Sequence, residues 1–220
     1  HHSQCVEAWL LNVPGLKVVV PSSPYDVKGL IKSAIRDKDP VVFLEHKLLY
    51  NMKGEVPEEE YVVPIVKANV VREGKDLTLV TYSGMVDKSV MAAEVLKNKG
   101  IEVEVVDLRT IRPLDVETLV SSIKKTERAM IVHEAAVFGG AGGEIAATIQ
   151  KEAFDYLDAP LAVLGSRNWI TPAFELEESF FPQVDWFFDI IHERIQPLEG
   201  YVPGENFTDG EMIRRGKLGV

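Results

Sequence analysis

The sequence predicts an α/β protein with a mostly parallel sheet, and three features of its 220 residues support this prediction. Short β-branched segments alternate with segments of helical period over most of the chain. Gly and Pro residues separate these segments. Hydrophobic residues make up 46% and charged residues 26%, which is typical of a globular protein with a substantial core. Strands that alternate with helices in this way form parallel sheets covered on both faces.

The first part of the chain predicts a helix, a strand, a second helix and a second strand. Residues 6–12 are an apolar-rich helical stretch that ends at a Pro-Gly pair. Residues 16–20 are short and β-branched, so we expect a buried strand. The Pro-Ser-Ser-Pro turn at 21–24 caps a helix over 25–35, and residues 41–44 form the next buried strand. This order is a βαβ unit, for which we expect a right-handed crossover.

A break in the alternation divides the chain into two domains. Residues 50–63 contain Gly, Pro and three consecutive Glu residues, and they predict a linker or an extended surface crossing. We therefore expect one domain at 1–62 and a second at 66–198. The tail at 199–220 is rich in Gly and charge without an apolar period, which predicts an extended C-terminal arm on the surface.

The second domain repeats the alternation of strands and helices. We expect strands at 77–81, 103–107, 129–132 and 161–164, and helices at 84–98, 116–123 and 144–156. A glycine-rich turn at 139–143 comes before the last of these helices, where backbone amides could bind an anion. Its spacing does not match G-x-G-x-x-G, and small residues also permit close contact between a helix and a sheet. We favour the structural interpretation, in which the small residues permit close contact between helix and sheet, over an anion-binding site.

Composition excludes several classes of partner. A net charge of −10 argues against nucleic acids and anionic membrane surfaces. No apolar run approaches the ~20 residues that span a bilayer, and no signal peptide opens the sequence. Cys5 is the single cysteine, so an internal disulfide is impossible. These features fit the cytoplasm, or the mitochondrial matrix in a eukaryote.

Local chemistry alone does not single out an active site. We expect His46 to be solvated, His133 to be a satisfied structural histidine, and His192 to be exposed on a helix. Asp37 and Asp39 follow a helix and could provide oxygen ligands to a cation, although a polar turn is the simpler interpretation. No Walker, zinc or nucleophile-elbow motif is present in the sequence.

Several blocks of the sequence, however, match a known family in order. The chain resembles the beta subunits of thiamine-diphosphate-dependent 2-oxo acid dehydrogenases from residue 2 to about residue 196. The blocks that carry the resemblance are His2-Ser3-Gln4, Glu7-Ala8-Trp9, Pro14 to Val19, Pro21 to Leu30, Asp39 to Tyr50, Asp107 to Asp115, His133-Glu134-Ala135, Gly139-Gly140 and Gly143-Glu144-Ile145.

The resemblance implies a transketolase-like architecture: the end of a pyrimidine-binding domain, followed by a transketolase C-terminal domain. It implies an alpha2-beta2 heterotetramer in which beta also contacts beta, with thiamine diphosphate bound where alpha and beta meet. The alpha subunit then supplies the magnesium and diphosphate site. The implied reaction is decarboxylation of a 2-oxo acid, followed by acyl transfer to the lipoyl group of an acyltransferase. His2 matches the active-site histidine of the family, which favours a native residue there over a tag remnant.

The resemblance also implies a potassium ion, bound by the carbonyl groups of Ala34, Ile35 and Asp37 with Asp39 close by. Many relatives have Asn at the position of Asp39. The catalytic glutamate of the family would lie upstream of residue 1. A Thr-Pro-x-Pro pattern common in the family is broken at 171–174, and the sequence continues some 20 residues past the usual end, by comparison with the family, which bears on acyltransferase docking.

Several functions fit this sequence. Pyruvate is the favoured substrate, and a branched-chain 2-oxo acid dehydrogenase, an acetoin dehydrogenase or a transketolase-like synthase are alternatives. A different class of function is a non-catalytic assembly module that docks the acyltransferase core. The His-Ser-Gln and Pro-Ser-Ser-Pro-Tyr-Asp blocks favour the dehydrogenases over the sugar-phosphate enzymes.

Overall fold

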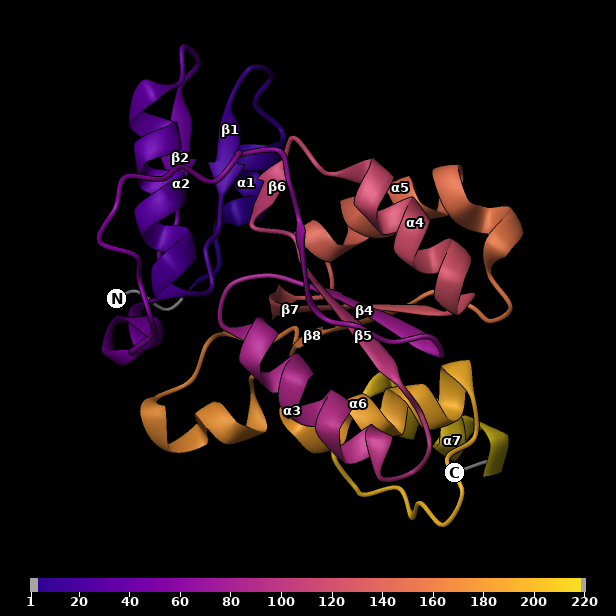
Figure 1. Cartoon of the computed structure of the whole chain (residues 1–220). Helices are drawn as coiled ribbons and strands as arrows, with labels where there is room; N and C mark the ends of the chain where they lie inside the picture. Colours follow the sequence, from indigo (N-terminus) through magenta and orange to yellow (C-terminus); the bar gives the residue numbers. More distant parts are fainter. Residues whose placement is uncertain (1–3, 219–220) are drawn as a thin grey trace.

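The computed structural model describes residues 4–218, and the side chains of residues 4–216. Two sheets lie side by side (Figure 1), a small one in the N-terminal part and a larger one flanked by helices. No helix within the described range is long and apolar enough to cross a membrane. The α/β class predicted from the sequence is confirmed.

The smaller sheet contains the predicted βαβ unit. Strand β1 (Lys17–Val19) pairs in parallel with β2 (Val41–Phe43), and α2 (Pro24–Arg36) connects them. The helix begins as its sequence predicts, with a serine N-cap and Pro at the first position. Helix α1 (Glu7–Leu11) precedes β1. The expectation that β2 is buried was wrong, because all its residues are half-buried at the edge of the described sheet.

A third strand of this sheet comes from the second half of the chain. Strand β6 (Thr110–Arg112) pairs antiparallel with β1, on the side opposite β2. Val18 and Val20 therefore share one hydrophobic core with Val80 and Val106 of the larger sheet. The two parts of the chain are thus joined by backbone pairing as well as by a common core.

The larger sheet has the strand order β3-β5-β4-β7-β8. Strands β4 (Leu77–Thr81), β5 (Val103–Asp107), β7 (Ala129–Ala136) and β8 (Ala162–Ser166) pair in parallel, as the sequence predicts. Strand β3 (Asn69–Arg72) adds an antiparallel edge that the sequence analysis missed. The carboxyl ends of the parallel strands face the small sheet, which makes this edge the natural place for a site.

Helices cover both faces of the larger sheet (Figure 1). Helices α4 (Val116–Thr126) and α5 (Ala141–Ala153) lie on one face, and α3 (Met85–Lys97) and α6 (Val184–Ile190) on the other. Alternate residues of β4 enter the two cores, as expected for a strand buried on both sides. Shorter helical segments lie at Lys47–Asn51 (η1), Phe154–Tyr156 (η2), Phe174–Ser179 (η3) and Ile191–Ile195 (η4, a π-helix).

The tail differs from the extended arm expected at 199–220. Helix α7 (Asp209–Leu218) packs beside α6, and buried polar contacts hold it there. The fully buried carboxylate of Asp189 accepts a hydrogen bond from Thr208 Oγ1 and forms an ion pair with Arg214 at 3.3 Å. These contacts are polar, so they produce no periodic pattern of apolar residues. The hydrophobic pattern of the sequence therefore could not predict that this segment forms a packed helix.

The glycine-rich turn before α5 has the structural role favoured from the sequence. A Cβ atom added to Gly142 would lie 2.3 Å from Nε2 of the buried His133, whereas one added to Gly143 would meet nothing within 4 Å. Gly142 therefore allows α5 to approach β7 closely.

We expect Gly142→Ala to destabilise the protein by about 1–3 kcal/mol, because the methyl group overpacks against the imidazole. The matched control, Gly143→Ala, should be neutral or stabilising by up to about 1 kcal/mol, the helix preference for Ala. Urea unfolding of both variants provides the comparison. Equal stability of the two would contradict the close approach.

Candidate functional site

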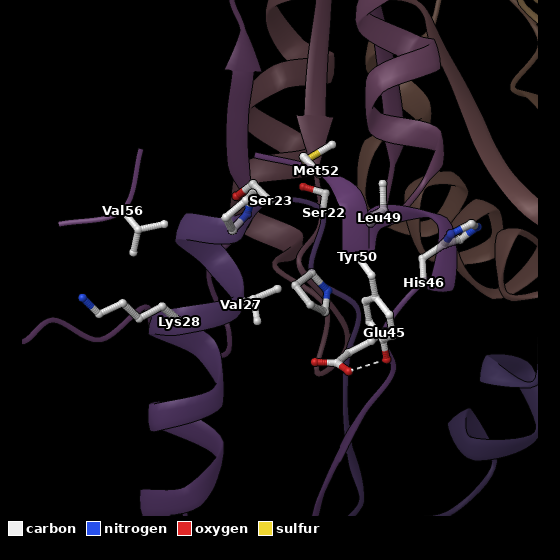
Figure 2. A pocket seen from close by; sticks show the side chains of 12 residues that line it. Ser22, Ser23, Val27, Lys28, Glu45, His46, Leu49, Tyr50, Met52 and Val56 are labelled. Carbon is white, nitrogen blue, oxygen red and sulfur yellow. Dashed lines mark hydrogen bonds between the residues drawn. The ribbon is translucent and has the colours of Figure 1, made fainter. Parts of the chain in front are cut away.

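A pocket of about 340 Å³ lies beyond the carboxyl ends of β1 and β2 (Figure 2). Parallel strands place ligand sites at this end of a sheet. The side chains around it come from the turn before α2, from α2, and from the segment that follows β2. They are Pro21, Ser22, Ser23, Pro24, Val27, Lys28, Glu45, His46, Leu49, Tyr50, Met52 and Val56.

The polar groups that line this pocket are largely engaged by the protein itself. The Tyr50 hydroxyl donates to Glu45 Oε2 at 2.8 Å, drawn as a dashed line in Figure 2. Lys28 Nζ donates to the carbonyl oxygen of Pro57. The rest of the wall is mostly apolar, and the His46 ring points away from the other labelled side chains in Figure 2. The pocket thus offers an apolar wall rather than free charges.

His46 is the first sequence candidate that the structure repositions. The expectation of a solvated strand end was wrong, because its side chain is 19% exposed and its Nε2 lies 2.5 Å from Glu134 Oε2. Its Nδ1 accepts a hydrogen bond from the amide of Leu48 at 3.2 Å. The Glu134 carboxylate raises the pKa of His46 above its usual value, against the opposing effect of burial.

A second buried contact lies beside this pair. The Tyr82 hydroxyl donates to Glu7 Oε1 at 2.8 Å, and both side chains are buried. Burial raises the pKa of Glu7 and, together with Glu7 itself, the pKa of Tyr82. Burial likewise raises the pKa of the nearby Cys5 thiol, with Glu7 adding to the effect. We call Glu7, His46, Tyr82 and Glu134 the His46 cluster.

The other side of the pocket rests on a buried group that we call the Asp107 cluster: Ser22, Asp26, Asp107 and Arg109. Ser22 Oγ donates to Asp107 Oδ2, and the Arg109 amide donates to Asp107 Oδ1 at 2.9 Å. The Arg109 guanidinium forms an ion pair with Asp26 Oδ1 at 2.6 Å. Burial raises the pKa of Asp107 to about 6. This cluster fixes the start of α2 to the end of β5.

His133 also differs from expectation. It is fully buried, and neither ring nitrogen has a hydrogen-bond partner among residues 4–216, so the expected satisfied histidine was wrong. Its ring lies parallel to that of Tyr82, with centroids 6.4 Å apart. Burial lowers the pKa of His133 to about 4, so the imidazole is neutral at pH 7. His133 is therefore a buried neutral ring that lies beside Tyr82 of the His46 cluster.

His192 is not among the residues that line this pocket. It belongs to η4 and is half-buried rather than exposed, because its Nδ1 accepts a hydrogen bond from the Leu198 amide at 2.9 Å. The amide is thereby satisfied after the last turn of the helix. His192 serves local structure.

The region of the expected potassium ligands has an ammonium group at its centre. Lys17 Nζ lies 2.7 Å from Asp37 Oδ2 and 3.1 Å from Asp39 Oδ2. The Ala34 carbonyl accepts a hydrogen bond from the Asp37 amide at 3.3 Å, as at many helix ends. The contact with Lys17 lowers the pKa of Asp37 and raises that of Lys17. One ammonium group thus compensates one of the two negative charges here, and the potassium expectation stays a prediction.

His2 lies outside the described residues. Within the described part, no group of three His, Cys, Asp or Glu side chains is arranged to hold a metal ion. The lining of the pocket contains Lys28 as its one lysine and no arginine, and Lys28 already binds a carbonyl oxygen. A magnesium diphosphate therefore does not fit the described residues that line this pocket.

Sequence reasoning missed Glu7, Tyr82 and Arg109 as site residues. Tyr82 comes one residue after a predicted strand, and Arg109 comes two residues after another. Their position just beyond the carboxyl end of a parallel strand could have indicated a role in a site. Glu7 carried a weaker signal, as an acidic residue within an apolar helical stretch.

Comparison with known protein families matches both parts of the chain. The family "Transketolase, C-terminal domain" matches residues 66–186, and "Transketolase, pyrimidine binding domain" matches residues 1–53. The chain belongs to the transketolase C-terminal domain family. The transketolase-like fold expected from the resemblance is confirmed.

This transketolase-family chain also has similar curated relatives. It is 46% identical over 199 residues to the "Pyruvate dehydrogenase E1 component subunit beta" of Staphylococcus epidermidis, covering 90% of the chain and 60% of that protein. It is 50% identical over 171 residues to the protein of the same name from Porphyra purpurea, covering 78% and 52%. The resemblance to beta subunits is confirmed, and the chain spans about 60% or less of the length of these relatives.

A solved structure shares the fold. The protein described as "Split gene transketolase, inactive beta4 tetramer" matches with a TM-score of 0.63 and 27% identity, over 78% of this transketolase-family chain and 54% of its own length. Both clusters join residues of the two matched domains. The pocket is lined by residues of the N-terminal part and borders the clusters through Ser22 and His46.

Proposed function

We propose that this chain is part of the beta subunit of a thiamine-diphosphate-dependent 2-oxo acid dehydrogenase, with pyruvate as its substrate. The observation that carries the proposal is the 46% identity to a pyruvate dehydrogenase E1 beta subunit over 90% of the chain. That span is longer than either matched domain, so it includes residues of both, on which the two clusters beside the pocket are built.

His2 is the proposed catalytic residue, acting on protons near the reacting carbonyl group, a task suited to imidazole near neutral pH. Support comes from the segment that follows it. Cys5 and Glu7 come three and five residues later in the sequence, and both enter the buried surroundings of the His46 cluster. The described chain that follows His2 is thus anchored at the edge of the larger sheet.

The cofactor site is proposed to be shared between subunits. We place the magnesium and the diphosphate on an alpha subunit, because the described residues that line the pocket do not fit them. The proposed assembly is an alpha2-beta2 heterotetramer with beta–beta contacts, which acts on the lipoyl group of an acyltransferase. A potassium ion at the end of α2, bound by carbonyl oxygens of Ala34, Ile35 and Asp37 near Asp39, is part of the same proposal.

The test uses the full-length beta subunit that contains this chain, co-expressed with its alpha subunit. We expect thiamine-dependent decarboxylation of pyruvate, and a fall in kcat of about 100-fold or more for His2→Ala. A panel of pyruvate, branched-chain 2-oxo acids and acetoin identifies the substrate. Activity on none of them would exclude the dehydrogenase assignment, and full activity of His2→Ala would exclude the role of His2.

A second candidate is a non-catalytic assembly module, and one observation favours it. The similar solved structure is described as an inactive beta4 tetramer, so a beta-type chain of this fold can assemble without activity. In that case the full-length chain should bind the acyltransferase core in a pull-down without its alpha partner. Failure to bind would remove this candidate. The whole chain is needed, since β6 pairs with β1 across the two parts.

A further inference from the structure

We propose that Tyr82 and Glu134 are positioning residues of the site, each holding one segment of the N-terminal part from the strand ends of the larger sheet. This inference rests on the proposed function. Tyr82 holds the start of α1 through Glu7, and Glu134 holds η1 through His46. Neither residue lines the pocket itself, so their effect passes through Glu7 and His46.

The first contact fixes the start of α1. Glu7 is its first residue, and the N-cap position, Val6, provides no side-chain cap. The position of the Glu7 carboxylate, 6% exposed, therefore depends on the Tyr82 hydroxyl at 2.8 Å. The Tyr82 ring is itself held parallel to the buried His133 ring. A buried carboxyl group that loses its donor pays the full cost of desolvation, so the segment would move to regain water.

The second contact fixes the tautomer of His46. Its Nδ1 accepts the Leu48 amide hydrogen, so in the neutral ring the proton must lie on Nε2. Glu134 Oε2, 2.5 Å from Nε2, accepts the hydrogen bond from that N–H group and so favours this tautomer. The same Nδ1 contact caps η1. Glu134 thus determines whether His46 can cap the segment that contributes Leu49 and Tyr50 to the pocket wall.

Both positioning residues belong to one rigid edge. Strands β4 and β7 are parallel neighbours in register, with Thr81 opposite Val132. Tyr82 follows β4, while Glu134 lies two residues further along β7. The charged groups that face His46 come from three elements: Glu134 on β7, Glu7 on α1 and Lys88 on α3. The two segments are therefore oriented by side chains of a buried sheet rather than by one another.

Hydrogen exchange of the full-length beta subunit, with and without its alpha partner, tests the positioning directly. Tyr82→Phe should speed amide exchange of Glu7–Leu11 about tenfold and leave Lys47–Asn51 unchanged. Glu134→Ala should do the reverse. In Glu134→Gln, the side-chain carbonyl still accepts from Nε2, so η1 should regain most of its protection. Matched controls are Tyr61→Phe and Glu94→Gln, whose hydrogen bonds lie outside the pocket and both clusters.

Steady-state kinetics of the assembled complex provide the second readout. We expect kcat to fall about tenfold in Tyr82→Phe and in Glu134→Ala, with KM changed less than about twofold, and Glu134→Gln to recover most of the loss. Unchanged exchange in both segments, or unchanged kcat in an active complex, would overturn the proposal. If the wild-type complex decarboxylates nothing, the proposed function fails, while the exchange experiment still decides the positioning.

Discussion

Replacing Arg109 with alanine is expected to destabilise the protein by about 3–5 kcal/mol, the cost of breaking a buried ion pair from one side. The Arg109 guanidinium lies 2.6 Å from Asp26 Oδ1, and these side chains are 13% and 4% exposed. Its loss leaves the Asp26 carboxylate buried without a counter-charge, next to the buried Asp107. Urea unfolding at pH 7 measures the change. Asp26 belongs to the N-terminal part of the chain and Arg109 follows β5 of the larger sheet, so the variant should also weaken the packing of these two parts against each other.

The control for this variant is Arg36→Ala, which removes an arginine from an ion pair on the surface. The Arg36 and Glu60 side chains are 57% and 66% exposed, so we expect a loss below about 1 kcal/mol. Adding Asp26→Asn to Arg109→Ala should recover part of the loss, since the Asp26 carboxylate that lost its counter-charge is then removed, while Asp107 stays. A loss for Arg109→Ala as small as that for Arg36→Ala would show that solvent already reaches Asp26.

The parallel strands were predicted well from the sequence, because strands buried on both faces consist mainly of apolar residues. Strands β4 and β5 occupy the predicted residues 77–81 and 103–107, where apolar residues contribute to both cores. The sequence analysis missed β3 and β6, which are short antiparallel strands whose pairing depends on partners far along the chain. It also missed α7, whose Arg214 pairs with Asp189 and whose Glu211 accepts hydrogen bonds from the amides of Asn206 and Phe207.

The site was harder to predict than the fold, because its contacts join distant parts of the chain. His46 was recognised as a histidine after a strand, but its partner Glu134 is 88 residues away. Glu7 and Tyr82 are 75 residues apart, a distance over which spacing carries no information. The family resemblance proposed a catalytic role for His2, which local chemistry did not favour, and that role stays a prediction. The topology of the sheet explains how these distant residues meet, because parallel strands bring their carboxyl ends to one edge.

The second large effect is expected at His133. Burial lowers its pKa in the folded protein to about 4, whereas an unfolded histidine titrates near its usual value of 6.5. The unfolded chain therefore binds a proton first, and stability is lost as pH falls from about 6.5 toward 4. The shift corresponds to about 3 kcal/mol at pH 4. His133→Leu removes this titration, so the variant should gain about 3 kcal/mol over the wild type between pH 7 and pH 4.

At pH 7 the same variant should be close to neutral, because both ring nitrogens of His133 lack partners within the described residues. Denaturant unfolding at pH 7, 5.5 and 4 gives the difference curve. His46→Gln provides a control of opposite sign: its pKa is raised, so deleting the imidazole should cost more at pH 5.5 than at pH 8. A flat difference curve for His133→Leu would mean that its ring can be protonated in the folded protein, and hence that water reaches the sheet behind the His46 cluster.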